Sequence, residues 1–317
     1  MTATTAVTRP LRAVELEVLE SIYSHRLMTT IQLWQLHTPA GETRQDRWMQ
    51  RIVAHLRRRG LIASVGRHGT PQLACWYATE RGAEAIEAAG TYPGRRVLVT
   101  PHGADGMLQS HTLAVNDVGV AFATAAKRHG HDCGHLAWQH EVAHRIADGH
   151  GGVRGGNLLV ADALLCYAAN VNGRVTLVYR FIELDRATMS PHDVGDKLRR
   201  YVRYASFVPK DAPGSRPAWR DRYPGLPGVL LILAGKPRPR LESRLEVLVG
   251  LYQIDPVLRD ADAPALSVCL LEDLQRHGPF AGIFTRPNTP EQPVDLLGRP
   301  RPSVSNALAA TGTEGAR

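Results

Sequence analysis

The chain contains few cysteines and no long apolar run. Its 317 residues include four widely separated cysteines, Cys75, Cys133, Cys166 and Cys269. This excludes the dense disulfide framework of small secreted proteins and indicates free thiols. No stretch reaches the roughly 18 apolar residues that a membrane-spanning helix needs. The first residues, MTATTAVTRPLRAVELEVL, have neither the basic nor the apolar segment of a secretory signal. We therefore expect a cytoplasmic protein that binds no membrane.

Acidic residues are outnumbered by basic ones. The sequence has 38 Lys and Arg against 30 Asp and Glu, which gives a formal net charge of +8. Residues 1–100 hold 13 of the basic and 8 of the acidic residues, so more than half of the excess lies in the first third. A basic protein attracts polyanions, and nucleic acid is the first of these to consider.

The first ninety residues show the pattern of three helices and a two-stranded ribbon. Two helical segments fall within residues 11–37, and Thr29 or Thr30 can cap the second. In a third helical segment, over 44–59, apolar residues recur every four positions at Trp48, Ile52 and Leu56. The runs LIASV and LACWYA, joined by GRHGT, predict the ribbon. This order predicts a winged helix-turn-helix over residues 10–90, whose third helix enters the major groove of DNA.

Arginines gather on the third helical segment, opposite its apolar face. At 100° per residue, Arg44, Arg47, Arg51 and Arg58 fall on one side, and Arg67 lies in the ribbon turn. A solvated surface is the plain alternative for such a face, and winged helices also serve as protein-docking or dimerisation elements. Because this is the helix that would enter the groove, we predict that these five arginines contact double-stranded DNA.

The rest of the chain predicts a second domain. Residues 91–108 are rich in Gly and Pro and mark a linker. Residues 109–285 predict the order α-β-β-β-α-β: a helix capped by Ser110, a strand, two strands joined at Asn172-Gly173, a helix capped by Ser190 and a buried strand. Residues 286–317 have the composition of a disordered tail. The predicted fold class is therefore α+β.

Carboxylates converge at one end of the predicted hairpin. A two-residue turn at 172–173 would place Asp162 opposite Glu183, about 5 Å away on the same face. Asp185 projects from that face one pleat further on. Clustered, desolvated carboxylates repel one another, and a divalent cation removes that conflict. We therefore predict that Asp162, Glu183 and Asp185 hold Mg²⁺, with Mn²⁺ as a substitute.

A lysine follows on the next helix. Lys197 lies at the edge of the helix's buried stripe, from which its ammonium can reach the carboxylates. If the protein cleaves phosphodiesters, these four residues are its catalytic residues: the metal activates water and Lys197 stabilises the developing charge. Glu141, on the preceding strand, is a fourth candidate carboxylate, although an exposed strand residue is the simpler interpretation.

This constellation resembles the PD-(D/E)xK nuclease superfamily, in which an Asp and a Glu-x-Lys hold Mg²⁺ and activate water. More closely, VADALL, FIELDRATMS and DKLRRYVRY, preceded by the winged helix and HTLAVNDV, resemble the replication-relaxation family of plasmid and mobile-element proteins. The resemblance covers roughly residues 10–250 and implies a restriction-endonuclease-like fold for the second domain. His111 matches a histidine of the family pattern, which implies a place beside the site or a phosphate contact, although a structural role is the simpler interpretation of a lone helix histidine.

The sequence departs from these patterns at three positions. Asp185 stands where the strand lysine is usual, so that Lys197 would replace it from the helix. Ala161 precedes Asp162 where a proline is common, and Ala187 occupies a position often held by glycine.

Two hypotheses about function follow. In the first, the protein binds plasmid or mobile-element DNA during replication or transfer, alongside replication or mobilisation proteins, and nicks or cleaves it with Mg²⁺. In the second, it is a non-catalytic winged-helix DNA-binding regulator with a relic nuclease-like domain. A zinc hydrolase built on His131, His135, His140 and His144 is a third and weaker reading, since paired ligand spacings are missing.

Overall fold

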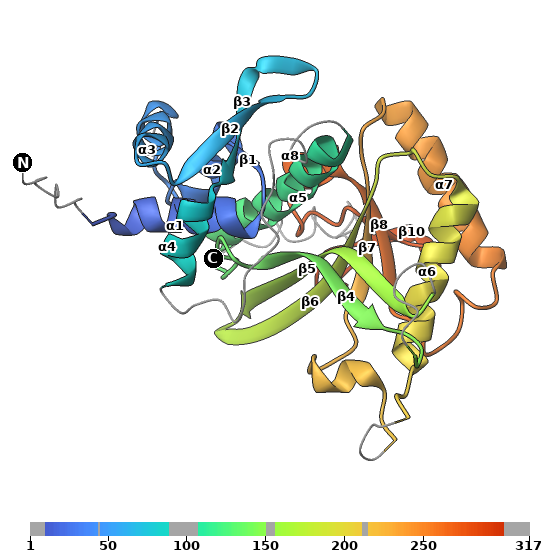
Figure 1. Ribbon diagram of the computed structural model, residues 1–317. Coiled ribbons are helices and arrows are strands. Elements are labelled where there is room, and N and C mark those ends of the chain that lie inside the picture. The colour runs from blue at the N-terminus through green and yellow to red at the C-terminus, as the bar shows by residue number, and fades with distance from the viewer. Residues whose placement is uncertain (1–9, 44, 89–106, 150–155, 211–214, 301–317) are drawn as a thin grey trace, which may run out of the picture. The chain divides into compact units, whose positions relative to one another are not determined.

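The computed structural model describes residues 10–43, 45–88, 107–149, 156–210 and 215–300 (Figure 1). The chain forms two compact units. The N-terminal unit extends to Arg128 and includes residues 134–136, and the C-terminal unit comprises residues 129–133 and the chain from Ala137 onward. The fold is mixed α+β, as the sequence predicts. No helix within the described ranges is both long enough and apolar enough to span a membrane.

The N-terminal unit combines helices with a small antiparallel sheet in the order β1-β3-β2. Its elements are α1 (Ala13–Ser24), β1 (Met28–Thr29), α2 (Thr30–His37), α3 (Arg47–Arg58), β2 (Ile62–Arg67), β3 (Thr70–Ala78), α4 (Glu80–Glu87) and α5 (Met107–His129). Thr29 caps α2 in a capping box with Gln32, as the sequence allows. The apolar face of α3 is buried, with Ile52 and Leu56 at most 2% exposed.

The long helix α5 packs on the N-terminal elements. Its Leu113 belongs to a buried cluster with Leu27, Cys75 and Tyr77. The Asn116 amide donates to the Leu27 carbonyl at 2.7 Å. The sequence predicted this segment in the second domain, whereas by its packing α5 belongs to the N-terminal unit up to Arg128. The cap predicted at Ser110 is wrong, because α5 already begins at Met107.

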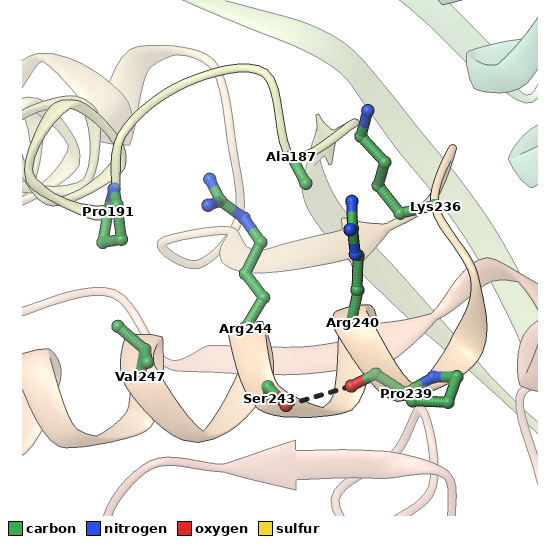
Figure 2. A pocket seen from close by; sticks show the side chains of 8 residues that line it. All are labelled: Ala187, Pro191, Lys236, Pro239, Arg240, Ser243, Arg244 and Val247. Atoms are coloured by element: carbon green, nitrogen blue, oxygen red, sulfur yellow. Dashed lines mark hydrogen bonds between the residues drawn. The ribbon is translucent and has the colours of Figure 1, made fainter.

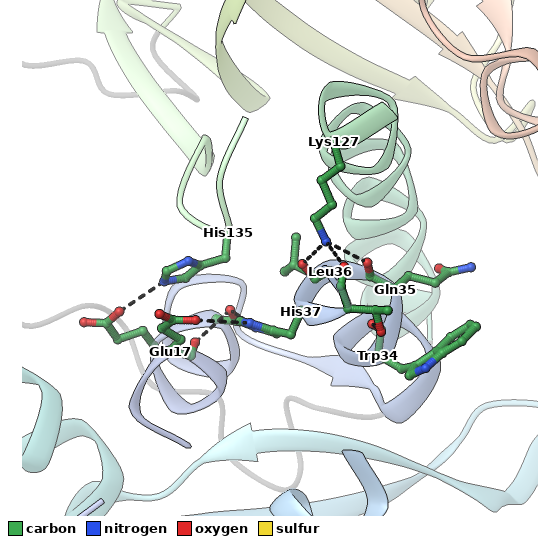
Figure 3. Close-up of polar contacts among 10 residues, drawn as sticks. Glu17, Trp34, Gln35, Leu36, His37, Lys127 and His135 are labelled. Atoms are coloured by element: carbon green, nitrogen blue, oxygen red, sulfur yellow. Dashed lines mark hydrogen bonds and ion pairs between the residues drawn. The ribbon is translucent and has the colours of Figure 1, made fainter. Parts of the chain in front are cut away.

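A lysine of α5 holds the last turn of α2 (Figure 3). The Lys127 ammonium donates to the carbonyls of Gln35, Leu36 and Thr38 at 3.1, 2.6 and 2.8 Å. The last carbonyls of a helix lack partners within the helix and carry partial negative charge. Lys127 therefore satisfies them and fixes the end of the helix that precedes α3.

The C-terminal unit is built on a seven-stranded sheet in the order β10-β9-β8-β7-β6-β5-β4, in which β6, β7 and β8 are parallel. Its elements are β4 (Trp138–Arg145), β5 (Leu158–Val171), β6 (Arg174–Asp185), α6 (Pro191–Ser206), a 3₁₀ turn η1 (Ala218–Asp221), β7 (Gly228–Leu233), α7 (Arg238–Ile254), β8 (Leu266–Leu270), α8 (Leu271–His277), β9 (Phe284–Arg286) and β10 (Thr289–Val294). One apolar core joins α6 and α7 to β5–β8.

The disordered tail was predicted to begin at residue 286, which is too early. Residues 289–294 form β10, which pairs with β9 at the edge of the sheet, and residues 301–317 lie outside the described residues. The prolines Pro290 and Pro293 suggested a loop, but proline is tolerated in an edge strand, where its missing N–H costs no ladder hydrogen bond.

Candidate functional site

The hairpin β5–β6 sets the geometry of the predicted site. The ladder runs without a shift from Val171↔Arg174 to Ala163↔Ile182. Asn172 and Gly173 form the turn with φ angles of 52° and 75°, as a type I′ turn requires. The register predicted from the sequence is therefore confirmed. Immediately beyond the ladder, the backbone N–H of Leu184 donates to Asp162 Oδ2 at 2.8 Å.

Lys197 joins the two carboxylates at this end of the hairpin. Its Nζ lies 3.0 Å from Asp162 Oδ1 and forms an ion pair with Glu183. The Tyr201 hydroxyl, one turn further along α6, donates to Glu183 Oε1. Helix α6 begins as the sequence predicts, with Ser190 and Asp193 in a capping box. The structure thus brings Asp162, Glu183 and Lys197 together.

Burial and charge perturb this cluster strongly. Glu183 is 3% exposed, and its burial, together with the nearby charge of Asp162, raises its pKa from 4.5 to about 8, against the opposing effects of Lys197 and Tyr201. Burial alone would lower the pKa of Lys197, but the two carboxylates outweigh it and raise that pKa above its ordinary value. Burial of Glu183, together with the one negative charge that two carboxylates leave beside one ammonium, favours an extra proton on the folded cluster.

Asp185 is held by other partners. Its Oδ1 accepts from the backbone N–H of Ala187 at 2.8 Å, and its Oδ2 is paired with Arg244. Arg244 also donates to the Met189 carbonyl at 2.8 Å. Ala187 has a φ of 53°, in the left-handed region where glycine is favoured, which accounts for the glycine of the family pattern at this position. Asp185 therefore anchors the turn that follows β6.

The residues present do not fit a three-carboxylate Mg²⁺ site as they stand. The donor atoms are the hard oxygens that Mg²⁺ prefers, but the Lys197 ammonium lies between Asp162 and Glu183, and Arg244 holds Asp185. In the part of the chain that the structure describes, no three His, Cys, Asp or Glu side chains are placed to hold a metal together. A cavity of about 30 Å³ lined by Glu183, Asp185 and Lys197 has room for about one water molecule. The magnesium site stays a prediction.

The predicted DNA-contacting arginines lie on α3, with two exceptions. Arg47, Arg51 and Arg58 are exposed and line one groove together with Ala54. Arg44 lies outside the described residues, and Arg67 is exposed at the end of β2. The turn after β2 is tied to α5, since the Gln109 side chain accepts from His68 N and donates to the Gly66 carbonyl.

The remaining candidates are scattered. His111 lies on α5 in the N-terminal unit, and Glu141 is exposed on β4 with a φ of 49°. The four histidines of the zinc reading meet different surroundings. Among them, His131 bonds to Tyr167, His135 to Glu20 and His144 to Tyr223.

Sequence reasoning missed the roles of Tyr201 and Arg244. Tyr201 lies in the buried stripe of α6, and its spacing of four from Lys197 is the one local signal that could have pointed to the shared carboxylate. Arg244 lies 59 positions after Asp185. No local pattern could have paired them.

Comparison with known proteins places the chain in a family. No curated protein matches it. Among solved structures it is similar to the restriction endonuclease FokI, with a TM-score of 0.30 and 13% identity over 84% of this chain and 43% of that one. The chain thus spans less than half of the FokI chain. A model of the replication-relaxation family matches residues 19–214, well over half of the sequence. The chain belongs to the replication-relaxation family.

Proposed function

We propose that this protein binds double-stranded DNA of plasmids or mobile elements through its N-terminal unit, in their replication or transfer. The observation that carries the proposal is the arginine face of α3. Arg47, Arg51 and Arg58 are exposed along one groove, and within the described ranges none of them has a carboxylate partner. Family membership supports the plasmid or mobile-element setting.

The charge on α3 favours a polyanionic partner. Three unpaired guanidinium groups on one helix repel one another, and DNA phosphates remove that repulsion while releasing counterions. Ala54 lies between Arg51 and Arg58 in the same groove, where its small side chain leaves space for a close approach. In the proposal, the N-terminal unit is a winged helix-turn-helix, α3 enters the major groove and the turn at Arg67 contacts phosphate.

The test is DNA binding by arginine variants, measured by fluorescence anisotropy on a duplex of about 30 base pairs. We expect Arg47→Ala and Arg51→Ala each to weaken binding by about 1–3 kcal/mol if they reach base edges, and Arg67→Ala mainly to lower the salt dependence. Arg57→Ala is the matched control, because Arg57 is exposed on α3 but does not line the groove. Unchanged affinity in all three test variants would refute the proposal.

A second candidate function, phosphodiester cleavage, rests on the buried cluster of Asp162, Glu183 and Lys197. Burying an ion cluster is costly compared with apolar packing, and groups with strongly shifted pKa values gather at functional sites. In this candidate the C-terminal unit is a restriction-endonuclease-like domain that uses Mg²⁺ or Mn²⁺, with Asp185 left outside the ligand set by Arg244. The opposing possibility is a relic nuclease-like scaffold in a DNA-binding regulator.

A further inference from the structure

A second basic surface lies in the C-terminal unit, at the start of α7 (Figure 2). There a pocket of about 470 Å³ opens between the turn after β6, the first residue of α6 and the first turns of α7. Its cationic lining residues are Lys236, Arg240 and Arg244. In Figure 2 the side chains of Arg240 and Arg244 extend from α7 toward the side on which Ala187 and Pro191 lie, and Lys236 stands beside Arg240. This basic pocket adjoins β6 through the ion pair of Arg244 with Asp185.

Two of the three cations are uncompensated. Lys236 and Arg240 are both exposed, and neither has an acidic partner within the described part of the chain. Arg238, on the same turn of α7, shows the contrast: its guanidinium is held by Asp273 at 2.7 Å and by Glu242 at 2.8 Å. Asp273 and Glu242 therefore pair with Arg238 and not with Lys236 or Arg240.

The start of α7 adds to this charge, whereas the Asp193 carboxylate already caps the start of α6. Pro191 is the first residue of α6, and Pro239 lies in the first turn of α7; both line the pocket. The amino ends of helices carry partial positive charge that favours anions. Arg186 lies close to Gly235, the residue before Lys236.

We propose that the basic pocket binds a phosphodiester group of a DNA strand. The inference deepens the proposed function, because it rests on DNA being the partner and names a second contact for it in the C-terminal unit. Ala187, Pro191 and Val247 supply apolar wall suited to a sugar, whereas no aromatic ring that could stack a base lines the pocket. Recognition is therefore of the backbone and independent of sequence.

The Arg244–Asp185 ion pair links the pocket to the carboxylate cluster. Asp185 ends β6 two residues after Glu183, and Arg244 is only 11% exposed in its side chain. Arg244 thus has a fixed place at the pocket's inner wall, while Lys236 and Arg240 are free to close on a phosphate. A phosphate held there lies next to the strand end that carries Glu183.

The experiment measures how DNA affinity of the full chain depends on salt, by anisotropy with a duplex of about 30 base pairs and random sequence. Each phosphate contact contributes roughly 0.9 to the slope of log K against log salt concentration. We expect the double variant Lys236→Ala/Arg240→Ala to lower that slope by about 2. The double variant Arg174→Ala/Arg203→Ala is the control, because it removes two exposed cations from the same unit outside the pocket.

The outcomes separate this proposal from the one on α3. A slope unchanged by the pocket variant, with affinity still lost in Arg47→Ala, overturns the basic pocket and leaves DNA binding by α3 standing. Wild-type protein that binds no duplex overturns both. If inorganic phosphate raises the melting temperature of the wild type but not of the pocket variant, and the DNA slope is unchanged, the pocket takes a free anion and the strand contact is refuted.

Discussion

Ionisation of Glu183 makes the stability of the fold depend on pH. Its pKa is about 8 in the folded protein against 4.5 ordinarily, because it is buried beside Asp162. Between these two values the folded chain keeps a proton that the unfolded chain has lost. The contribution is therefore fully present below about pH 4.5 and is lost as the pH rises through about 8.

We predict that the free energy of unfolding falls by a few kcal/mol between pH 5 and pH 8 through this group alone. Glu183→Gln, which keeps the shape and cannot ionise, should remove that fall. The measurement is urea denaturation of both proteins at several pH values.

The quantity to compare is the difference in the free energy of unfolding between wild type and Glu183→Gln at each pH. Burial lowers the pKa of His37 to about 3 and that of His144 to about 4. These groups act in the opposite direction, since the unfolded chain binds their protons below about pH 6.5. They contribute equally to both proteins and cancel. A difference that does not grow with pH would contradict the raised pKa of Glu183.

For single residues, the sequence could predict only those contacts that follow from the local geometry of a strand or a helix. The meeting of Asp162, Glu183 and Lys197 followed from the two-residue period of strands and the stripe of one helix. The same two-residue period suggested that Asp185 belongs to the ligand set, but Arg244 pairs with it. Because Arg244 lies 59 positions away in the chain, no local sequence pattern could predict that pairing.

Elements whose ends are set by neighbouring residues were predictable. The Asn172-Gly173 turn fixed the hairpin, and the caps at Thr29 and Ser190 fixed two helix starts. The start of α5 and the strand β10 were not predictable. Packing of Leu113 against Leu27, Cys75 and Tyr77 determines the position of α5, and pairing with β9 determines β10. Such long-range contacts override the local signals of Ser110 and of the proline-rich segment.

We predict that Lys127→Met loosens the end of α2. The variant removes three hydrogen bonds to carbonyls of the last turn, each worth about 1 kcal/mol net, and a cation at the negative end of the helix. Hydrogen exchange of the amides of Leu36, His37 and Thr38 should become faster, and the protein should lose roughly 1–3 kcal/mol of stability.

Arg128→Met is the matched control for this change. Arg128 is the exposed neighbour of Lys127 on α5, so its replacement should leave exchange in α2 unaltered. If the α2 amides exchange at the same rate in Lys127→Met as in wild type, the lysine does not hold the helix end.

At the scale of the whole molecule, part of the net charge of +8 lies on two surfaces that can bind an anion. Each unit carries cations without acidic partners in its described part: the arginines of α3 in one and the basic pocket in the other. Composition predicted a polyanionic partner, yet it could not predict the pocket. Only the structure shows that Glu242 and Asp273 pair with Arg238, so that Lys236 and Arg240 have no acidic partner in the described part of the chain.

The last prediction separates a cleaving protein from a binding protein. Without metal, Asp162→Asn, Glu183→Gln and Lys197→Ala should leave DNA affinity unchanged, since none of the three lies on α3 or in the basic pocket. If the cluster is catalytic, wild-type protein with Mg²⁺ or Mn²⁺ nicks or linearises supercoiled plasmid. Both carboxylate variants should abolish the reaction, because the metal would lose anionic ligands. Lys197→Ala should slow it, because the transition state would lose a stabilising positive charge. Thermal melts of each variant show whether a loss of cleavage is a loss of folding, and Arg203→Ala on the exposed side of α6 is the control. Wild-type protein that binds duplex DNA but neither cleaves any plasmid form nor binds metal by calorimetry is a DNA-binding regulator whose buried cluster serves only the fold.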